Sequence, residues 1–319
     1  MIHAACGDAA LKQFLGARTV LSLTVLEREG RIWKSGSPSC YATLLVERTM
    51  VYRDPFDRGP LHRESGGLRN PRTNVLYPFR DGIPVFVMPA EIDGPNTRYQ
   101  RLYDRVAPFY DLSTRLYAWL KSGAEETRRS VYLKLLELRP SARFLEVSVG
   151  TGANWAYLSR DLQFHGLDLS WGMLTRCRRR VRRLHLEAEL CQGLAEHLPY
   201  PENYFDCVFH MGGINFFTDP AAALREMIRV ACPGTRLVVV DETEEFAERH
   251  EKTFFARAFY GDRPRTIKAP LDLLPPQMEE VQLDTVWAGD LYVLSFRKPG
   301  PTGSLGEPCP PRTQGRLDF

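Results

Sequence analysis

The feature that most constrains the fold is an apolar run that breaks on two glycines, FLEVSVGTGANW at residues 144–155. In doubly wound α/β folds a strand that turns on glycine into a helix forms a ligand cradle, because a residue without a side chain lets the backbone approach the ligand. The next apolar run, FHGLDL, ends in Asp168, and an acid at that position hydrogen-bonds the hydroxyls of a ribose. The two features together predict a nucleoside-containing ligand. Taken singly, an ordinary strand-to-helix turn and a helix cap explain them as well, although Ser170 is better placed as the cap.

The spacing of the glycines separates two ligand classes. A dinucleotide site needs G-x-G-x-x-G, and the chain has Ser148, Gly150 and Ala153 at those three positions. Sites for S-adenosylmethionine tolerate E/D-x-x-x-G-x-G, which Glu146, Gly150 and Gly152 satisfy. No pyrophosphate has to be accommodated in such a site. The turn therefore favours S-adenosylmethionine over NAD.

From Tyr99 to Lys298 the expected strands alternate with helices, which is the pattern of a layered α/β fold with a mostly parallel sheet. A tight Ala-Gly-Asp turn separates the last two strands, which predicts an antiparallel hairpin. A helix should begin at Asp219-Pro220, because an N-cap residue followed by proline is a helix-start signal. The expected strands are 142–149, 164–169, 187–192, 204–210, 235–241, 279–286 and 290–297.

The chain of 319 residues is long enough for one large domain with an appendage. Residues 1–95 carry short β-type runs broken by turn residues, which predicts a small β-rich domain, with a turn-rich linker at 91–97. Residues 96–298 form the expected α/β domain. The Pro- and Gly-rich tail, 299–319, is expected to be disordered.

Charge and composition disfavour several partners. The net charge of +3 is too small to indicate a nucleic acid or a membrane. The basic cluster RCRRRVRRLH at 176–185 could meet RNA phosphates, but an apolar stripe of Leu174, Cys177, Val181 and Leu184 favours the solvated face of a packed helix. The chain has no long apolar run, no signal peptide and no C-x-x-C pair among its seven cysteines. We therefore expect a cytoplasmic protein with reduced thiols and no metal.

Six ordered motifs resemble those of class I S-adenosylmethionine-dependent methyltransferases: FLEVSVGTG, GLDLSWGML, LAEHLPYPENYFDCVF, LREMIRV, PGTRLVVVDE and the closing hairpin. A helix pattern Y-D-x-x-A-x-x-Y-D, with Tyr103, Ala107 and Tyr110, is similar to that of the ubiquinone/menaquinone-biosynthesis group, methyltransferase type 11. The resemblance implies a Rossmann-like sheet of seven strands in the order 3-2-1-4-5-7-6, with the last strand antiparallel. It also implies S-adenosyl-L-methionine as methyl donor and S-adenosyl-L-homocysteine as product.

The resemblance further implies a division of labour around the cofactor. The glycine turn and Glu146 would hold the methionine end, Asp168 would bind the ribose, and Leu169 and Met173 would pack on the adenine. The family usually has an acid that binds the adenine amino group where this chain has Leu194, and this departure predicts weaker cofactor binding. The implied cofactor residues are Tyr103, Glu146, Gly150, Thr151, Gly152, Asp168, Leu169, Met173, Ala195, Glu196, His210 and Met211.

Methyl transfer from a sulfonium depends chiefly on alignment of the reacting atoms, and it needs a base only if the accepting atom carries a proton. His210, at the end of the fourth expected strand, is the first candidate base, although filling the top of the sheet explains it equally well. Asp241 is a second candidate, which could equally cap a helix. Tyr110, with Tyr103, would form a lid over the cofactor or simply pack at helical spacing.

Residues 50–88 resemble the small β domain of methyltransferase-activator subunits and of some ribosomal-RNA guanine methyltransferases. Zinc-bearing members of that group hold the metal with cysteines, whereas this chain has residues such as Arg53, Asp54 and Asn70 there. Zinc needs four N or S ligands close together. We therefore expect a degenerate, metal-free version of a zinc ribbon.

The sequence predicts a methyltransferase acting on a small molecule by in-line displacement. Aromatic and apolar residues near the expected pocket favour a hydrophobic or aromatic acceptor; they include Tyr103, Tyr110, Trp119, Ile214, Phe216, Phe217, Phe254 and Phe255. Three alternatives stay open: an RNA methyltransferase, a non-catalytic partner subunit, and a member of the fold that catalyses a cyclisation. A homodimer is also left open.

Overall fold

The computed structural model describes residues 51–87, 94–120, 125–250 and 266–300, and for much of 108–128 it describes the backbone alone. Contacts divide the chain into Met1–Met50 and Val51–Phe319, and all of the described residues lie in the second unit. The expected β-rich segment before residue 51 and all but the first two residues of the expected tail lie outside the described residues.

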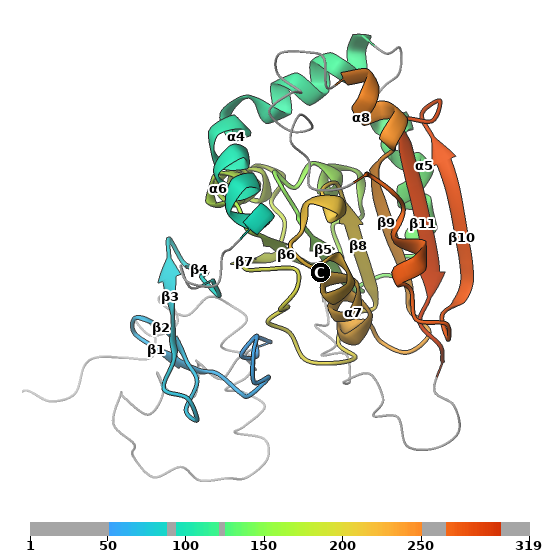
Figure 1. Cartoon of the computed structure of the whole chain (residues 1–319). Coiled ribbons are helices and arrows are strands. Elements are labelled where there is room, and N and C mark those ends of the chain that lie inside the picture. Colours follow the sequence, from blue (N-terminus) through green and yellow to red (C-terminus); the bar gives the residue numbers. More distant parts are fainter. Residues whose placement is uncertain (1–50, 88–93, 121–124, 251–265, 301–319) are drawn as a thin grey trace, which may run out of the picture. The chain divides into compact units, whose positions relative to one another are not determined.

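The centre of the unit is a sheet of seven strands in the order β10-β11-β9-β8-β5-β6-β7 (Figure 1). Numbered along the chain, this order is 3-2-1-4-5-7-6, so the predicted topology is confirmed. The first five strands are parallel, and β11 pairs antiparallel with both β9 and β10. Their bounds are β5 Arg143–Val147, β6 Gln163–Asp168, β7 Ala188–Gln192, β8 Cys207–Met211, β9 Arg236–Glu242, β10 Glu279–Val286 and β11 Leu291–Arg297.

The strands match the expected ones closely, with one instructive shift. The fourth was expected from residue 204, yet β8 begins at Cys207. Phe205 makes only an isolated bridge, to Ala231, because it lies beside the loop after a helix instead of a neighbouring strand. Periodicity alone does not distinguish such a bridge from a strand.

Helices connect the strands, and their ends follow local capping chemistry. The side chain of Ser170 accepts from the amide of Met173 at 3.2 Å, which caps α6. Asp219 accepts from the amide of Ala222 at 2.9 Å, which caps α7 as predicted. The bounds are α4 Gly94–Leu120, α5 Glu125–Leu133, α6 Trp171–Leu184, α7 Pro220–Val230 and α8 Glu244–His250, with short 3-10 turns η2 Lys134–Leu136, η3 Ala153–Tyr157, η4 Ile214–Phe216 and η5 Pro270–Leu273.

One expectation about the linker is wrong. Residues 91–97 were predicted to be a turn-rich connection, but α4 begins at Gly94. The Gly-Pro pair at 94–95 opens this helix, because proline fits the first turn, where its missing amide costs nothing. Turn-type composition and a helix start look alike in sequence.

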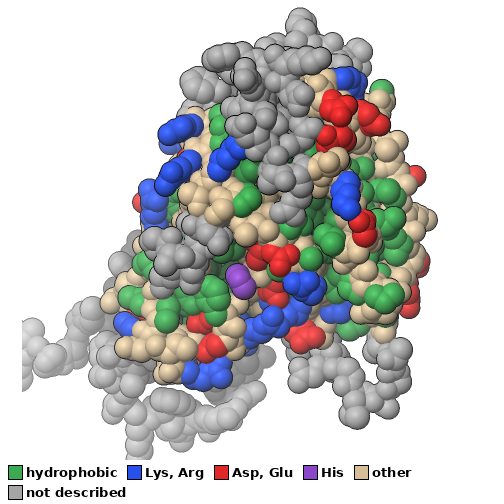
Figure 2. All heavy atoms as spheres, in the orientation of Figure 1, with side chains coloured by type: hydrophobic (Ala, Val, Ile, Leu, Met, Phe, Trp, Pro, Cys, Tyr) green, Lys and Arg blue, Asp and Glu red, His purple; other side chains and the backbone are tan. Residues whose placement is uncertain are grey.

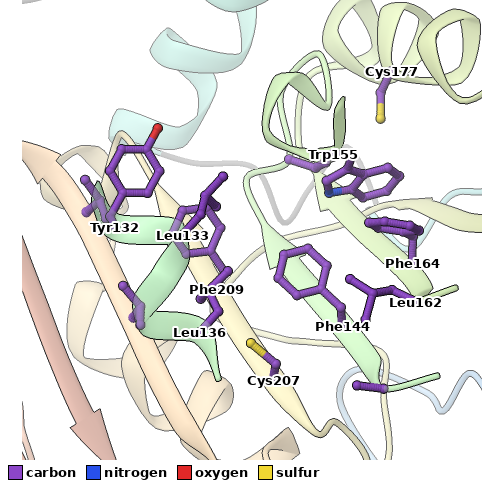
Figure 3. Close-up of a cluster of buried hydrophobic side chains, with 14 of the residues drawn as sticks. Tyr132, Leu133, Leu136, Phe144, Trp155, Leu162, Phe164, Cys177, Cys207 and Phe209 are labelled. Carbon is purple, nitrogen blue, oxygen red and sulfur yellow. The ribbon is translucent and has the colours of Figure 1, made fainter. Parts of the chain in front are cut away.

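The central strands of the sheet are buried on both faces. One cluster of buried side chains contains several packed aromatic rings (Figure 3). Trp155 is 1% exposed and its ring centroid lies 4.9 Å from that of Phe164. The stripe predicted for α6 is part of this packing: Leu174 and Cys177 are fully buried, and Val181 and Leu184 pack against the cluster. Figure 2 shows Lys and Arg side chains gathered over α4 and α6. Of the basic cluster, Arg179, Arg182 and Arg183 are exposed.

A second sheet of four antiparallel strands precedes the α/β part: β1 His62–Glu64, β2 Gly67–Arg69, β3 Leu76–Arg80 and β4 Ile83–Pro84. Its turns are joined by a buried polar network. The carboxylate of Asp54 accepts from the side-chain amide of Asn70 at 2.7 Å and from the hydroxyl of Tyr77 at 3.0 Å. Asp54 and Asn70 stand where zinc-bearing members of the resembling group have cysteines, and here they bind each other.

Candidate active site

The turn after β5 holds three residues in the left-handed region: Ser148 at φ 58°, Gly150 at φ 55° and Gly152 at φ 68°. For Ser148 this conformation costs on the order of 1 kcal/mol that a glycine would avoid. The two glycines have different surroundings. A side chain on Gly150 would meet nothing closer than 4.0 Å, whereas one on Gly152 would lie 2.8 Å from the sulfur of Cys177. Gly150 therefore has room beside it for a ligand, and Gly152 lets α6 pack closely against the turn.

Asp168 joins the ends of the first two strands. Its carboxylate accepts from the amide of Gly150 at 2.7 Å and from the amide of Ser170 at 2.8 Å. The residue is 9% exposed, and burial raises the pKa of its carboxyl to about 6. A carboxylate has about four acceptor positions, so these contacts leave acceptor capacity for a hydroxyl of a ribose.

Glu146 lies in a buried chain of polar groups that the sequence analysis missed. One carboxylate oxygen accepts from the side-chain amide of Asn154 at 2.6 Å, and the guanidinium of Arg129 donates to the Asn154 carbonyl at 2.5 Å. The other oxygen of Glu146 is buried and has no hydrogen-bond partner in the described part of the chain. Burial raises the pKa of Glu146 to about 7. Neither Arg129 nor Asn154 carries a local sequence signal, because α5 and η3 bring them together only in the fold.

His210 is fully buried at the end of β8. Its Nδ1 lies 3.0 Å from the carbonyl oxygen of Val147, which can only accept, so Nδ1 carries the proton. Burial lowers the pKa of His210 and favours the neutral ring. Its Nε2 is then an unprotonated acceptor, and it has no partner among the described residues. The ring of Phe217 packs edge-on at 5.4 Å between centroids.

Asp241, the second candidate base, is already engaged. It accepts from the amides of Gly213 and Glu242, each at 3.0 Å, and from the side chain of Asn215 at 3.3 Å. The carboxylate is 2% exposed. These contacts fix the loop after β8, which is a positioning role.

A narrow pocket lies beside the ends of β6 and β7. Leu169 contributes to its wall, and the Leu169 carbonyl accepts from the side chains of Gln192 at 2.8 Å and Gln100 at 3.3 Å. Glu196 accepts from the side-chain amide of Asn96 at 2.9 Å. The lining residues are Asn96, Ser148, Leu167, Leu169, Gly193, Leu194, Ala195, Glu196 and Phe217. Three of the predicted cofactor residues, Leu169, Ala195 and Glu196, thus line one pocket, and Asn96 joins them from α4.

The other predicted residues have various environments. Thr151 is held by Arg180, whose guanidinium donates to the threonine carbonyl at 2.5 Å and hydroxyl at 2.8 Å. Met173 is buried in the first turn of α6. Met211 is half-buried, with its sulfur 4.0 Å from Arg129.

Of the aromatic and apolar residues predicted to border the site, some lie in the core, one lines the pocket and the others are not described. Tyr103 is half-buried and packs against a small cluster that includes Phe216. Ile214 and Phe216 are core residues, 1% and 4% exposed, while Phe217 lines the pocket. The side chains of Tyr110 and Trp119, and the whole of Phe254 and Phe255, lie outside the described residues.

Parallel pairing explains why residues distant in sequence meet here. Val147 pairs with Leu167 on one side and with His210 on the other, so the ends of β5, β6 and β8 lie level. The glycine turn, a buried acid after β6 and two partnerless polar atoms, on Glu146 and His210, therefore share one edge. Together with the strand order, this arrangement defines an α/β domain of the class that binds an adenosyl cofactor at the carboxyl edge of its sheet.

Comparisons with known proteins agree with this class. A family model described as a methyltransferase domain matches residues 145–239. The ubiquinone/menaquinone biosynthesis C-methyltransferase UbiE of Proteus mirabilis is 30% identical over 174 residues, which are 53% of this chain and 68% of the relative. The demethylmenaquinone methyltransferase of Corynebacterium kroppenstedtii is 34% identical over 142 residues, 44% of this chain and 58% of the relative. The chain thus spans between about half and two thirds of these relatives' own lengths.

Among solved structures, a SAM-dependent methyltransferase from Aquifex aeolicus has a TM-score of 0.43 and 19% identity, covering 53% of this chain and 88% of that one. The sequence relationships show that the chain belongs to the family of S-adenosylmethionine-dependent methyltransferases. The cofactor of this family is S-adenosylmethionine. The pocket and the partnerless buried oxygen of Glu146 fit that cofactor, which carries a hydrogen-bonding amino acid end. In the described residues no three metal-ligating side chains cluster and no helix is long and apolar enough to cross a bilayer.

Proposed function

We propose that this chain transfers the methyl group of S-adenosylmethionine to a ring carbon of a small hydroxylated aromatic compound, such as a quinol. The support for the acceptor class comes from the relatives, which are named for ubiquinone and menaquinone biosynthesis. The observation that carries the proposal is the buried, unprotonated Nε2 of His210, beside the ring of Phe217 and level with the glycine turn.

The cofactor side of the mechanism is binding and orientation. The Asp168 carboxylate holds the ribose, with Gly150 giving room for close approach. The free oxygen of Glu146 accepts from the amino group at the methionine end. When bound, S-adenosylmethionine supplies an electrophilic methyl group, and an aligned acceptor can displace the thioether in one step.

The acceptor side needs a base, because a phenolic ring carbon becomes a good nucleophile when the hydroxyl loses its proton. In this proposal His210 takes that proton at Nε2, while its Nδ1–H stays bonded to Val147. The ring carbon forms its bond to the methyl group as the carbon–sulfur bond breaks. The ring hydrogen then leaves as a proton to water, which restores the aromatic ring as a phenolate, and the phenolate takes back the proton held at Nε2 of His210.

Two measurements test the proposal. Calorimetry should show micromolar binding of S-adenosylhomocysteine, and a radiolabelled methyl donor should label a reduced, demethylated naphthoquinol. Binding without labelling of any quinol, but with salt-sensitive labelling of RNA, would support the RNA alternative. Absence of cofactor binding would favour the non-catalytic alternative.

A further inference from the structure

The adenine side of the pocket has few polar groups with which to recognise a base. Of the side chains that line it, only Asn96, Ser148 and Glu196 can form hydrogen bonds, and the remaining lining is aliphatic, aromatic or glycine. Leu194 occupies the position at which the family resemblance leads us to expect an acid, and it is 7% exposed. An exocyclic amino group entering this pocket needs an acceptor from another element, because a buried donor left without a partner is costly.

Asn96 provides such an acceptor, and its orientation is fixed. The residue is 5% exposed in the first turns of α4. Its side-chain nitrogen lies 2.9 Å from a carboxylate oxygen of Glu196. A carboxylate can only accept, so Asn96 must present its NH2 group to Glu196. Asn96 lines the pocket, and the carbonyl oxygen of the same amide accepts no hydrogen bond from the described residues.

Glu196 is committed to holding this arrangement. The oxygen that binds Asn96 also lies 3.4 Å from the amide of Asp219, at the start of α7. With two donors already on it, this oxygen has little capacity left to accept from a ligand. Further along α4, Gln100 donates to the Leu169 carbonyl and the carboxylate of Asp104 accepts from the Ser170 hydroxyl at 2.6 Å. Residues at i, i+4 and i+8 share one helix face, so this face of α4 is fastened along the pocket.

From this geometry we infer that Asn96 is the residue that recognises the 6-amino group of the adenine, in place of the acid missing at Leu194. The inference rests on the proposed cofactor site. It makes the carbonyl of Asn96 a specificity determinant: a 6-amino group donates to it, whereas the 6-oxo group of a hypoxanthine would place two acceptors face to face. The adenine is then recognised by a residue of α4, and not by the loop after β7.

The test measures base selectivity by calorimetry on the full chain. S-adenosylhomocysteine is compared with S-inosylhomocysteine, which carries a 6-oxo group in place of the 6-amino group. The native protein should prefer the adenosyl compound about tenfold or more, because one hydrogen bond is gained and one repulsion avoided. Asn96→Ala should reduce that preference about tenfold, with the affinity for the inosyl compound unchanged or increased.

Gln100→Ala is the matched control. It loosens the same helix one turn further on but removes no group from the pocket, so it should weaken both ligands by the same factor and leave the preference intact. Adding Leu194→Asp to Asn96→Ala should restore the preference, because an acceptor returns to the pocket lining. Asn96→Ser, which keeps a small polar side chain too short to reach, serves if the alanine variant does not fold.

The outcomes separate this inference from the proposed function. If Asn96→Ala weakens both compounds equally, the residue only positions α4 and the inference is wrong, while the cofactor site stands. If the native protein binds neither compound, the proposed function fails first.

Discussion

The amide of Gly150 donates to the carboxylate of Asp168 over 2.7 Å, so the glycine turn and the acid after β6 are one structural unit. The acid expected to bind a ribose also fixes the turn against which that ribose would lie. Loss of this carboxylate therefore disturbs two parts of the site at once. A variant that keeps the hydrogen bond but removes the charge is needed to separate the effects.

Asp168→Ala should weaken binding of S-adenosylhomocysteine by about tenfold or more, which corresponds to about 1.4 kcal/mol or the loss of one good hydrogen bond. Binding should also depend on pH. The pKa of Asp168 is raised to about 6, so the carboxyl is ionised above pH 6 and becomes protonated as the pH falls through 6. Affinity should decline over that fall. Calorimetry at several pH values checks both effects, and Asp168→Asn, which does not titrate, should lose part of the pH dependence; unchanged affinity in the alanine variant would contradict the role.

His210→Gln should lower kcat by about 10²–10⁴-fold, the usual contribution of a general base, with the affinity for S-adenosylhomocysteine little changed. Glutamine retains hydrogen-bonding capacity near Val147 but cannot take up a proton. Because burial lowers the pKa of His210, the native rate should stay flat well below pH 6.5. The kcat-against-pH profile measures this, and an undiminished kcat in the variant would leave His210 a packing residue.

His165 should make the folded state sensitive to acid. It is buried in β6 beside Phe205, with ring centroids 5.1 Å apart, and burial lowers its pKa to about 3. In the unfolded chain His165 takes up a proton near pH 6.5, whereas in the folded chain it stays neutral down to about pH 3. The contribution of His165 to stability is therefore complete above pH 6.5 and declines as the pH falls towards 3. Its slope is about 1.4 kcal/mol per pH unit. Urea denaturation between pH 4.5 and 6.5 should show a shallower pH dependence for His165→Leu than for the native protein.

The acids of the site affect the pH dependence of stability in the opposite direction to His165. Glu146 and Asp168 have raised pKa values in the folded chain, about 7 and about 6, so their contributions to stability are complete at low pH and decline as the pH rises through those values. Equal pH slopes for the His165→Leu variant and the native protein would show that His165 does not stay neutral in the fold.

Gly152→Ala should reduce the free energy of unfolding by more than the roughly 1 kcal/mol expected for alanine at a positive φ, because its methyl group would meet the sulfur of Cys177 at 2.8 Å. Gly150→Ala is the matched control: its φ is similar, but the added methyl group meets no atom closer than 4.0 Å. Urea denaturation of both variants, each with and without Cys177→Ala, tests the contact. The cysteine change should rescue part of the Gly152→Ala loss and none of the Gly150→Ala loss, and equal losses in the two glycine variants would point to backbone strain alone.

Sequence reasoning predicted the fold well, because the relevant signals are local. Buried parallel strands are short apolar runs, and the Ser170 and Asp219 caps are visible as single residues before helices. The start of α4 was mistaken for a linker because Gly94 and Pro95 are common to both. The expectation that both glycines serve ligand approach was also incomplete, since the neighbour that Gly152 must avoid lies on the next helix.

The sequence by itself determined the positions of the strands, the glycine turn and an acid after the second strand, since each depends on residues close together in the chain. The strand order came from the resemblance to a known family, because it depends on pairing between distant segments. The tertiary structure decided which groups are free to act. In the folded chain the carboxylate of Asp241 accepts three hydrogen bonds. Glu146 and His210 each keep one buried polar atom without a partner in the described residues, and the side-chain NH2 of Asn96 donates to Glu196. These outcomes depend on burial and on hydrogen bonds between residues up to a hundred positions apart, which no local pattern encodes.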